Sequence, residues 1–298
     1  MMAAVKVVRV RGRGVLRAEG DIDPVIIRRM HERGIQLLTG QSSAATGLAS
    51  LFRPSDRVGI KVNTIAGRRL STPPEVSLPL SKLLTQTGLL EKNIVIWDRT
   101  NDELKEAGYK LQAGSGLRIF GTDAMGAGYT QEPLIHLNIG SLLSTIQADF
   151  VTASVSLAVL KDHGLAGITA GMKNYFGAIH NPNKYHDSNC NPYVAELFDL
   201  PEIKAKHRLT ILDALVVQYH RGPSYNARWA ERFESLIFSL DPVAADFIGW
   251  QIIERLRKAK GLPSLSEEKR EPLYIRTASR LGLGRAAVND IQLIEEDV

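Results

Sequence analysis

The run DFVTASVSL at residues 149–157 has the composition of a buried β-strand, because it is rich in β-branched residues and is followed within a few positions by polar ones. Three similar runs lie at residues 58–63 (VGIKVN), 93–98 (NIVIWD) and 209–213 (LTILD). Stretches with helical spacing of apolar residues lie between them. This alternation predicts an α/β fold with a largely parallel sheet flanked by helices.

Two helices have clear start signals. Asp23-Pro24 and Asp241-Pro242 each place a capping carboxylate before a proline in the first helical turn. The second of these helices is expected to end near Gly261. Between residues 73 and 90, a helix is expected to begin near Pro79 or to bend there, because proline lacks the backbone N–H that the helix interior needs.

The length and composition of the chain predict a single globular domain over residues 1–298. Apolar residues make up 44% of the chain, which is enough for a large core. No long linker divides the sequence, although two α/β lobes, of about residues 1–145 and 146–298, are a finer expectation. No run of 18 apolar residues and no signal-peptide core occur, so we expect a soluble chain with no membrane contact. The compartment stays open, because an export signal could have been removed.

The chain is basic, with a formal net charge of +5 at pH 7, and four arginines (Arg9, Arg11, Arg13 and Arg17) lie near the N-terminus. Aromatic residues for base stacking make up only 6%, so we expect no nucleic-acid partner. The alternating arginines and valines here suggest an edge strand with a solvated face. The positive charge favours a small anionic molecule as the partner. The single cysteine, Cys190, excludes an iron–sulfur cluster from this chain alone, so redox chemistry of that kind would need a separate partner protein.

Polar residues occur where the predicted strands end. Lys61 and Asn63 close the first run, and Asp98 and Arg99 close the second. Lys161 and His163 follow the third run, and Asp213 closes the fourth. In open α/β sheets, ligands bind outside the carboxyl ends of the strands. The sequence therefore predicts a cleft at that edge, although some of these residues could simply cap turns.

Residues 160–186, LKDHGLAGITAGMKNYFGAIHNPNKYH, combine histidines, lysines and glycines with one acidic residue. A histidine can act as an acid or base near neutral pH, and a lysine in a cleft can hold a carboxylate. We therefore predict His163 and Lys173 as catalytic residues. The predicted substrate-binding residues are Lys61, Asn63, Asp98, Lys161 and Asn174. The segment matches neither a P-loop nor a dinucleotide fingerprint.

The following loop, HNPNKYHDSNCNPY at residues 180–193, contains two histidines and the cysteine. His180 and His186 are candidate ligands for a divalent metal, although their spacing fits no compact zinc site. The alternative is that this loop covers the cleft as a lid held by asparagine turns.

At these residues the chain resembles the domain of unknown function family numbered 362. The resemblance rests on a strand leading to Lys161 and His163, then Thr169, then Lys173-Asn174 and Gly177, and it extends to GIKVN (59–63), IHNPNKYH (179–186), LTILDAL (209–215) and SLDPVAADFIGW (239–250). Many members carry a ferredoxin-like cluster module and others look exported, and this chain has neither feature. Where similar proteins tend to have a histidine after the LST run, this chain has Pro73.

The chain also has a more distant similarity to the nickel-dependent lactate racemase family, since His163 and Lys173 match its H-x-x-x-G-x-x-x-G-x-K spacing. This similarity implies two lobes around a cleft, an acid/base histidine and a lysine that tethers a nickel-containing nucleotide. The cofactor itself stays unknown.

Together these features favour an enzyme that acts on a small carboxylate or hydroxy-acid-like molecule, of an isomerase/racemase or oxidoreductase kind. In this hypothesis His163 moves a proton, Lys173 and Lys61 hold negative charge, and Asn63 and Asn174 orient the ligand. The alternative is a non-catalytic accessory protein that binds a ligand, a metal or a redox cofactor.

Overall fold

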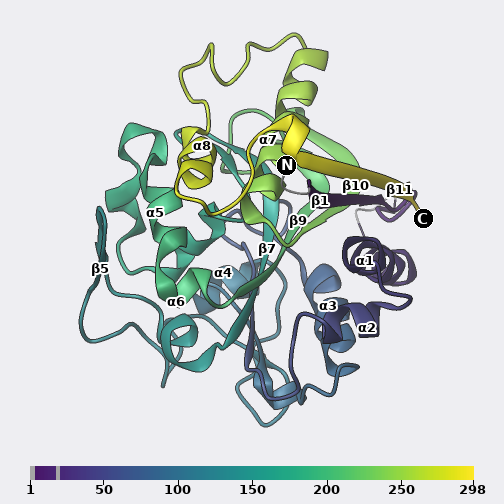
Figure 1. The fold of residues 1–298 in the computed structure, drawn as a ribbon, viewed down its shortest axis with the longest axis vertical. Helices are drawn as coiled ribbons and strands as arrows, with labels where there is room; N and C mark the ends of the chain where they lie inside the picture. The colour runs from purple at the N-terminus through teal and green to yellow at the C-terminus, as the bar shows by residue number, and fades with distance from the viewer. Residues whose placement is uncertain (1–3, 18–20) are drawn as a thin grey trace.

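A nine-stranded mixed sheet runs through the middle of the protein in a computed structural model that describes residues 4–17 and 21–298 (Figure 1). The strands, in the order in which they lie, are β11 (Ile291–Asp297), β1 (Val5–Arg11), β10 (Ala230–Ser239), β9 (His207–Gln218), β7 (Ala153–His163), β2 (Val58–Lys61), β3 (Ile94–Trp97) and β4 (Arg118–Ile119), with β8 (Gly167–Thr169) paired to the end of β7. The run from β9 to β4 is parallel throughout. This arrangement confirms the predicted α/β fold with a largely parallel sheet.

Helices cover both faces of the sheet. The α-helices are α1 (Pro24–Thr39), α2 (Ala44–Ala49), α3 (Pro74–Thr85), α4 (Asn101–Glu106), α5 (Tyr193–Asp199), α6 (Pro201–Lys204), α7 (Pro242–Ala259) and α8 (Leu273–Arg280). Shorter turns of helix are η1 (Glu91–Asn93), η2 (Ile146–Phe150), η3 (Lys173–Ala178), η4 (Pro182–Tyr185), η5 (Asp187–Cys190), η6 (Ala227–Trp229) and η7 (Val288–Asp290). Within the described residues, no helix is both long and apolar enough to cross a bilayer.

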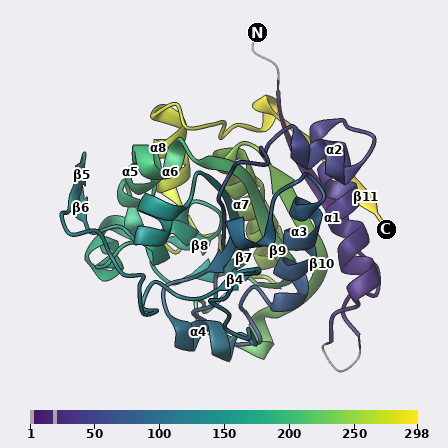
Figure 2. The ribbon, with the colours of Figure 1, turned by 90° about the horizontal axis from the view of Figure 1, so that it is seen from below.

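Two apolar clusters form the core, one on each face of the sheet. The group α1, α2 and α3 lies on one side and the group α5, α7 and α8 on the other (Figure 1). Successive side chains of a strand point to opposite faces, so β7 contributes Leu157 to the first cluster and Leu160 to the second. A small hairpin of β5 (Leu134–His136) and β6 (Ile139–Ser141) projects from the body (Figure 2).

The predicted helix starts are confirmed. The carboxylate of Asp23 accepts hydrogen bonds from the first backbone N–H groups of α1, and Asp241 accepts one from Ala244 N at 2.8 Å at the start of α7. The helix near Pro79 begins earlier than expected, at Pro74, and Pro79 lies inside it. The carbonyl that proline leaves without a partner, that of Glu75, belongs to an exposed residue, where water can replace the lost bond.

Two strands are longer than the sequence suggested. β7 begins at Ala153 and continues to His163, so Lys161 and His163 lie on the strand and do not follow it. β9 extends to Gln218, which places Asp213 in its middle and not at its end. The ends of both strands were predicted too early because a charged residue usually marks a strand end. Here Lys161 and Asp213 are instead buried in the sheet.

The N-terminal strand is not at an edge. β1 lies between β10 and β11, and its arginines pair with acidic residues of the C-terminal strand. Arg9 contacts Glu295 at 3.0 Å, and Arg13, just beyond the strand, contacts Asp297 at 2.6 Å. Arg11 lies 4.0 Å from Glu234 of β10, and Arg17 lies 2.7 Å from the nearby Asp23. The four arginines of the basic cluster therefore each have an acidic neighbour, two of them at the other end of the chain. A division into two lobes near residue 145 stays a prediction; in the sheet, β1 lies among strands from the second half of the chain.

Candidate functional site

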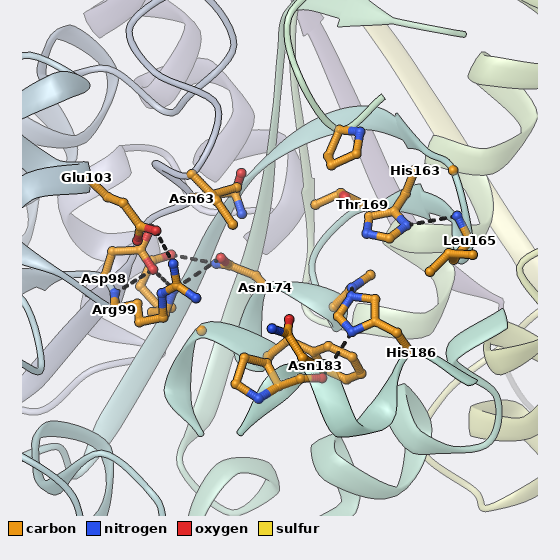
Figure 3. A pocket seen from close by; sticks show the side chains of 18 residues that line it. Asn63, Asp98, Arg99, Glu103, His163, Leu165, Thr169, Asn174, Asn183 and His186 are labelled. Carbon is orange, nitrogen blue, oxygen red and sulfur yellow. Dashed lines mark hydrogen bonds and ion pairs between the residues drawn. The ribbon is translucent and has the colours of Figure 1, made fainter. Parts of the chain in front are cut away.

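A cleft of about 360 Å³ opens at the carboxyl ends of β2, β3 and β7, where the parallel part of the sheet was expected to bind a ligand. Figure 3 shows Asp98, Arg99 and Glu103 at one end and His163 and His186 at the other, with Asn63 and Asn174 between them. The cleft is also lined by Lys61, Ile65, Gly164, Leu165, Thr169, Lys173, Phe176, Gly177, Pro182, Asn183 and Pro223.

Most of the predicted site residues line this one cleft. Those that do so are Lys61, Asn63, Asp98, His163, Lys173, Asn174 and His186. Lys161 and His180 do not line it. Lys161 is fully buried beneath the surface of the cleft, and the His180 ring packs edge-on against Tyr129 with 5.2 Å between ring centroids.

A buried ion pair joins β2 to β3 at the base of the cleft. Lys61 Nζ donates to Asp98 Oδ1 at 2.5 Å and to the carbonyl of Val62 at 2.9 Å. The other carboxylate oxygen of Asp98 accepts from the backbone N–H and the hydroxyl of Thr64, at 2.7 and 2.6 Å. Arg99 N also donates to Oδ1 at 2.8 Å. Both charges are thus compensated inside the protein, as buried charges must be.

Asn174 completes this group, and we refer to Lys61, Asp98 and Asn174 as the floor cluster. The Asn174 amide donates to the carbonyl of Lys61 at 2.8 Å and to Ser156 Oγ at 3.1 Å. Its oxygen lies 3.4 Å from Lys61 Nζ and accepts a hydrogen bond from it. The side chain therefore ties η3 to β2 and β7, and its polar atoms are occupied within the protein.

Two glycines allow η3 to lie so close to the sheet. A Cβ on Gly177 would lie 2.8 Å from Lys61 Nζ and 2.9 Å from Asp98 Oδ1, which is closer than atoms pack. A Cβ on Gly171 would lie 2.5 Å from Thr210 Cγ2. The buried carboxylate of Asp246, from α7, accepts from Gly171 N at 2.7 Å and Met172 N at 3.1 Å. The distant SLDPVAADF motif therefore fixes the turn that starts η3.

His163 is held in one tautomer by its own turn. Its Nδ1 accepts hydrogen bonds from the backbone N–H groups of Leu165 at 3.2 Å and Ala166 at 3.1 Å, so the ring proton lies on Nε2 (Figure 3). Burial, with the nearby Lys173 charge as the next cause, lowers the pKa of His163 to about 2. The imidazole is therefore neutral at physiological pH, and its Nε2 N–H is the group that can donate a hydrogen bond.

Lys173 and His186 form a hydrogen-bonded pair beside it, and we refer to His163, Lys173 and His186 as the histidine–lysine cluster. His186 Nδ1 donates to the carbonyl of Pro182 at 3.0 Å, so its Nε2 is free to accept from Lys173 Nζ at 3.3 Å. The rings of His163 and His186 stack with 5.5 Å between centroids. Lys173 Nζ also lies 4.2 Å from the centroid of the Phe176 ring.

No carboxylate makes an ion pair with Lys173 among the described residues. Burial lowers the pKa of this lysine from 10.5 to about 8. A substantial fraction of the amine is therefore neutral just above neutral pH, unlike an exposed lysine. This gives the cleft a base with a pKa close to the operating range of most enzymes.

Lys161 lies under the cleft with fewer partners than a buried ammonium usually has. Its Nζ donates to the carbonyl of Leu70 at 3.3 Å. Burial lowers the pKa of Lys161 to about 7, although the charge of Asp98 acts in the opposite direction. Because the side chain has no exposed surface, it lies outside direct reach of a ligand in the cleft.

The opposite end of the cleft supplies an amide and an ion pair. The side-chain oxygen of Asn63 is buried and has no hydrogen-bond partner among the described residues. Arg99 pairs with Glu103, one helical turn further along α4. Arg99 was expected at this edge from its place after the second strand, whereas Glu103 was missed from the sequence, although its i, i+4 spacing from Arg99 was a readable signal. Pro223 and Leu165 carried no chemical signal at all, and only the fold brings them to the cleft.

The residues present do not fit a metal site. Within the described part of the chain, no group of three or more His, Cys, Asp or Glu side chains could hold a metal ion. His180 lies away from the cleft, and His186 uses both ring nitrogens in hydrogen bonds. Cys190 is buried, and burial raises the pKa of its thiol. We therefore derive no step through a metal or a nickel-containing nucleotide.

The loop from His180 to Tyr193 forms part of the cleft wall. Pro182, Asn183 and His186 line the cavity, and Tyr185 anchors the loop by donating to the carbonyl of Gly140 at 2.8 Å. The loop is therefore part of the wall of the cleft, and its role as a lid stays a prediction.

Comparisons with known proteins gave one family match. Residues 58–251 match the model of the family described as Domain of unknown function (DUF362). None of the curated proteins matches the chain. A crystal structure of a protein from Thermotoga maritima, from the Northeast Structural Genomics Consortium, is similar at 11% identity with a TM-score of 0.44, over 81% of this chain. This chain spans 60% of the length of that protein. The similarity to lactate racemases is not confirmed.

Proposed function

The chain belongs to the DUF362 family, and from the geometry of its cleft we propose that it is an enzyme that moves a proton on a small carboxylate or hydroxy acid. One observation carries this proposal. Lys173 is an amine at the cleft surface with a pKa of about 8, no carboxylate partner among the described residues, and a histidine that orients it. Groups with pKa values shifted by burial in a cleft are typical of functional sites.

The proposed roles differ from those expected from the sequence. Lys173 in its neutral form takes a proton from the carbon next to the substrate carboxylate. The C–H bond breaks, an N–H bond forms on Nζ, and the electron pair passes to the carboxylate or carbonyl oxygen. His163 donates its Nε2 proton as a hydrogen bond to that oxygen, because a histidine with a pKa of about 2 stays neutral and is a poor base. His186 accepts from Lys173 and keeps its lone pair directed.

The other end of the cleft would hold the substrate. The buried oxygen of Asn63 lacks a partner among the described residues and accepts a hydrogen bond from a substrate hydroxyl. Arg99 binds a second anionic group, at the far end of the substrate, with the part of its guanidinium that Glu103 leaves open. The floor cluster, in this proposal, supports the site without touching the ligand, since its polar atoms are engaged with one another.

Returning the proton from Lys173 to either face of the carbon gives an isomerase or racemase. The test is proton exchange in D2O with a panel of 2-hydroxy acids, followed by loss of the α-proton signal in NMR spectra. Wild-type protein should exchange at least one compound, and Lys173→Met should slow the exchange by 100-fold or more. Lys92→Met, which removes an exposed lysine, is the matched control and should exchange like wild type.

The non-catalytic alternative predicts a different result in the same experiment. A carrier or accessory protein would bind a compound of the panel, as seen by line broadening, and would leave its α-proton in place. Exchange that survives unchanged in Lys173→Met would also count against the proposed base.

A further inference from the structure

A second cleft lies on the other side of the loop that forms part of the first. It has a volume of about 590 Å³ and shares no lining residue with the first cleft. Within the connecting loop, Asn63 and Ile65 face the first cleft, whereas the segment from Arg68 to Ser71 lines the second. Strands β9 and β10 complete it with Asp213 and Arg232.

The base of this cleft holds a carboxylate in an unusual position. Asp213 is only 4% exposed and lies in the middle of β9, where apolar residues are the rule. Its Oδ1 accepts one hydrogen bond, from Leu215 N at 3.0 Å. No cation pairs with it among the described residues, so burial raises the pKa of Asp213 to about 7. A buried, unpaired carboxylate costs stability, and the first cleft makes no use of it.

A second polar group in the cleft also lacks a partner. The hydroxyl of Ser71 is buried and makes no hydrogen bond to any described residue. Ser71 is 6% exposed and lines the same cleft as Asp213. The Ser71 hydroxyl has almost no accessible surface, so Asp213 is the polar group that a ligand in this cavity reaches.

Positive charge lies at the rim. Arg68 and Arg69 are exposed and form no ion pair with any described residue. The Arg69 guanidinium lies 5.6 Å from the centroid of the Tyr225 ring, which holds it beside the opening. Arg232 is less free, because it donates to the carbonyl of Leu16 and lies 3.7 Å from Glu234. Asp21 and Glu75 also line the cleft, so an anionic group is favoured only at the part of the rim that Arg68 and Arg69 form.

We propose that this second cleft binds a small phosphorylated molecule with free hydroxyl groups, whose hydroxyls meet Asp213 and whose phosphate meets Arg68 and Arg69. The carboxylate accepts from hydroxyl groups, which a phosphate alone cannot offer at neutral pH. A phosphate dianion suits two adjacent guanidinium groups, which bind it with several N–H donors. This ligand goes beyond the proposed proton transfer, because the two clefts have separate linings.

Ribose 5-phosphate is a suitable probe, and ribose and inorganic phosphate serve as its two halves. Isothermal titration should show that wild-type protein binds ribose 5-phosphate at least 10-fold more tightly than either half. Arg68→Ala/Arg69→Ala should weaken binding by 10-fold or more, whereas the control Arg29→Ala/Arg53→Ala, which removes two exposed arginines elsewhere, should not change it. Absence of ribose 5-phosphate binding to wild type, or an equal loss in both double variants, overturns the proposal.

The variant Asp213→Asn distinguishes a role of Asp213 in ligand binding from a role in stability. The variant has nearly the same shape and removes the buried charge, so its melting temperature should be at least that of wild type. Its affinity for ribose 5-phosphate should nevertheless fall 10-fold or more, and unchanged affinity would contradict the assigned role. Lys173→Met should bind the probe like wild type, so failure of the proposed proton transfer leaves this result untouched.

Discussion

The floor cluster and the histidine–lysine cluster lie in the same cleft, and they differ in how their polar atoms are used. In the floor cluster, Lys61, Asp98 and Asn174 satisfy one another and the backbone of two strands. In the histidine–lysine cluster, Lys173 has a histidine and an aromatic ring as neighbours and no carboxylate partner among the described residues. The difference teaches that a charged residue at a site can either stabilise the fold or be available to a ligand. Whether it has a partner of opposite charge inside the protein distinguishes the two cases.

The largest expected effect is on the floor cluster. Lys61→Met leaves Asp98 buried without its cation, and removing one partner of a buried ion pair typically costs about 3–5 kcal/mol. Urea unfolding followed by circular dichroism measures this change, with Lys92→Met as the exposed control. A loss below about 1 kcal/mol would show that the pair does not hold β2 and β3 together.

A smaller effect is expected at Gly177. Alanine there places a Cβ 2.8 Å from Lys61 Nζ, and overpacking of this kind costs about 1–3 kcal/mol. Gly114→Ala is the control, since a Cβ at that exposed glycine meets no atom within 4 Å. If both variants unfold at the same urea concentration, η3 is not packed as closely on the ion pair as described.

Lys173→Met should behave in the opposite way to Lys61→Met, with stability at pH 7 that is unchanged or higher. The pKa of Lys173 is about 8 in the folded protein and near 10.5 when unfolded. Between these values the unfolded chain binds more protons, so the stability of wild type rises with pH relative to the variant. Urea unfolding of both proteins at pH 7 and pH 10 tests the sign. A relative gain toward low pH would contradict the burial of an unpaired amine.

At neutral pH the smallest effect concerns His163, because its ring is neutral there in both the folded and the unfolded chain. Its pKa is about 2 when folded and 6.5 when unfolded, so this group's contribution to stability is complete above pH 6.5 and is lost as the pH falls toward 2. NMR spectra of the imidazole nitrogens should show a neutral ring with the proton on Nε2 at pH 5. If the His163 ring is mostly protonated at pH 5, its pKa is not lowered by burial, and the acid/base role predicted for it from the sequence would be favoured again.

Much of the fold was predictable. The apolar runs around Val58, Asn93 and Asp149 became β2, β3 and β7, and the caps at Asp23 and Asp241 opened α1 and α7 where expected. These signals are local, because strand runs and caps depend on residues a few positions apart. The lengths of β7 and β9 were not predictable, since a charged residue inside a strand depends on distant partners.

The cleft was predictable as a place, because parallel strands end at one edge and carry their polar residues there. Which of those residues face a ligand was not. Lys161 and Lys173 are both lysines of the same segment, yet one is buried under the cleft and the other lines it. Asp213 was predicted to lie at a strand end, beside the other polar residues of the cleft. It lies instead in the middle of β9 and lines a different cleft.

The sequence by itself therefore determined the α/β class, the main helices and the edge of the sheet where polar residues gather, because these follow from periodicity and capping within short stretches. Only the tertiary structure decided that Lys61 is paired, that the ring proton of His163 lies on Nε2 and that Lys173 has a lowered pKa. Burial and hydrogen-bond partners set the charge and protonation state of these side chains. Some of the partners come from strands and loops more than a hundred residues away along the chain.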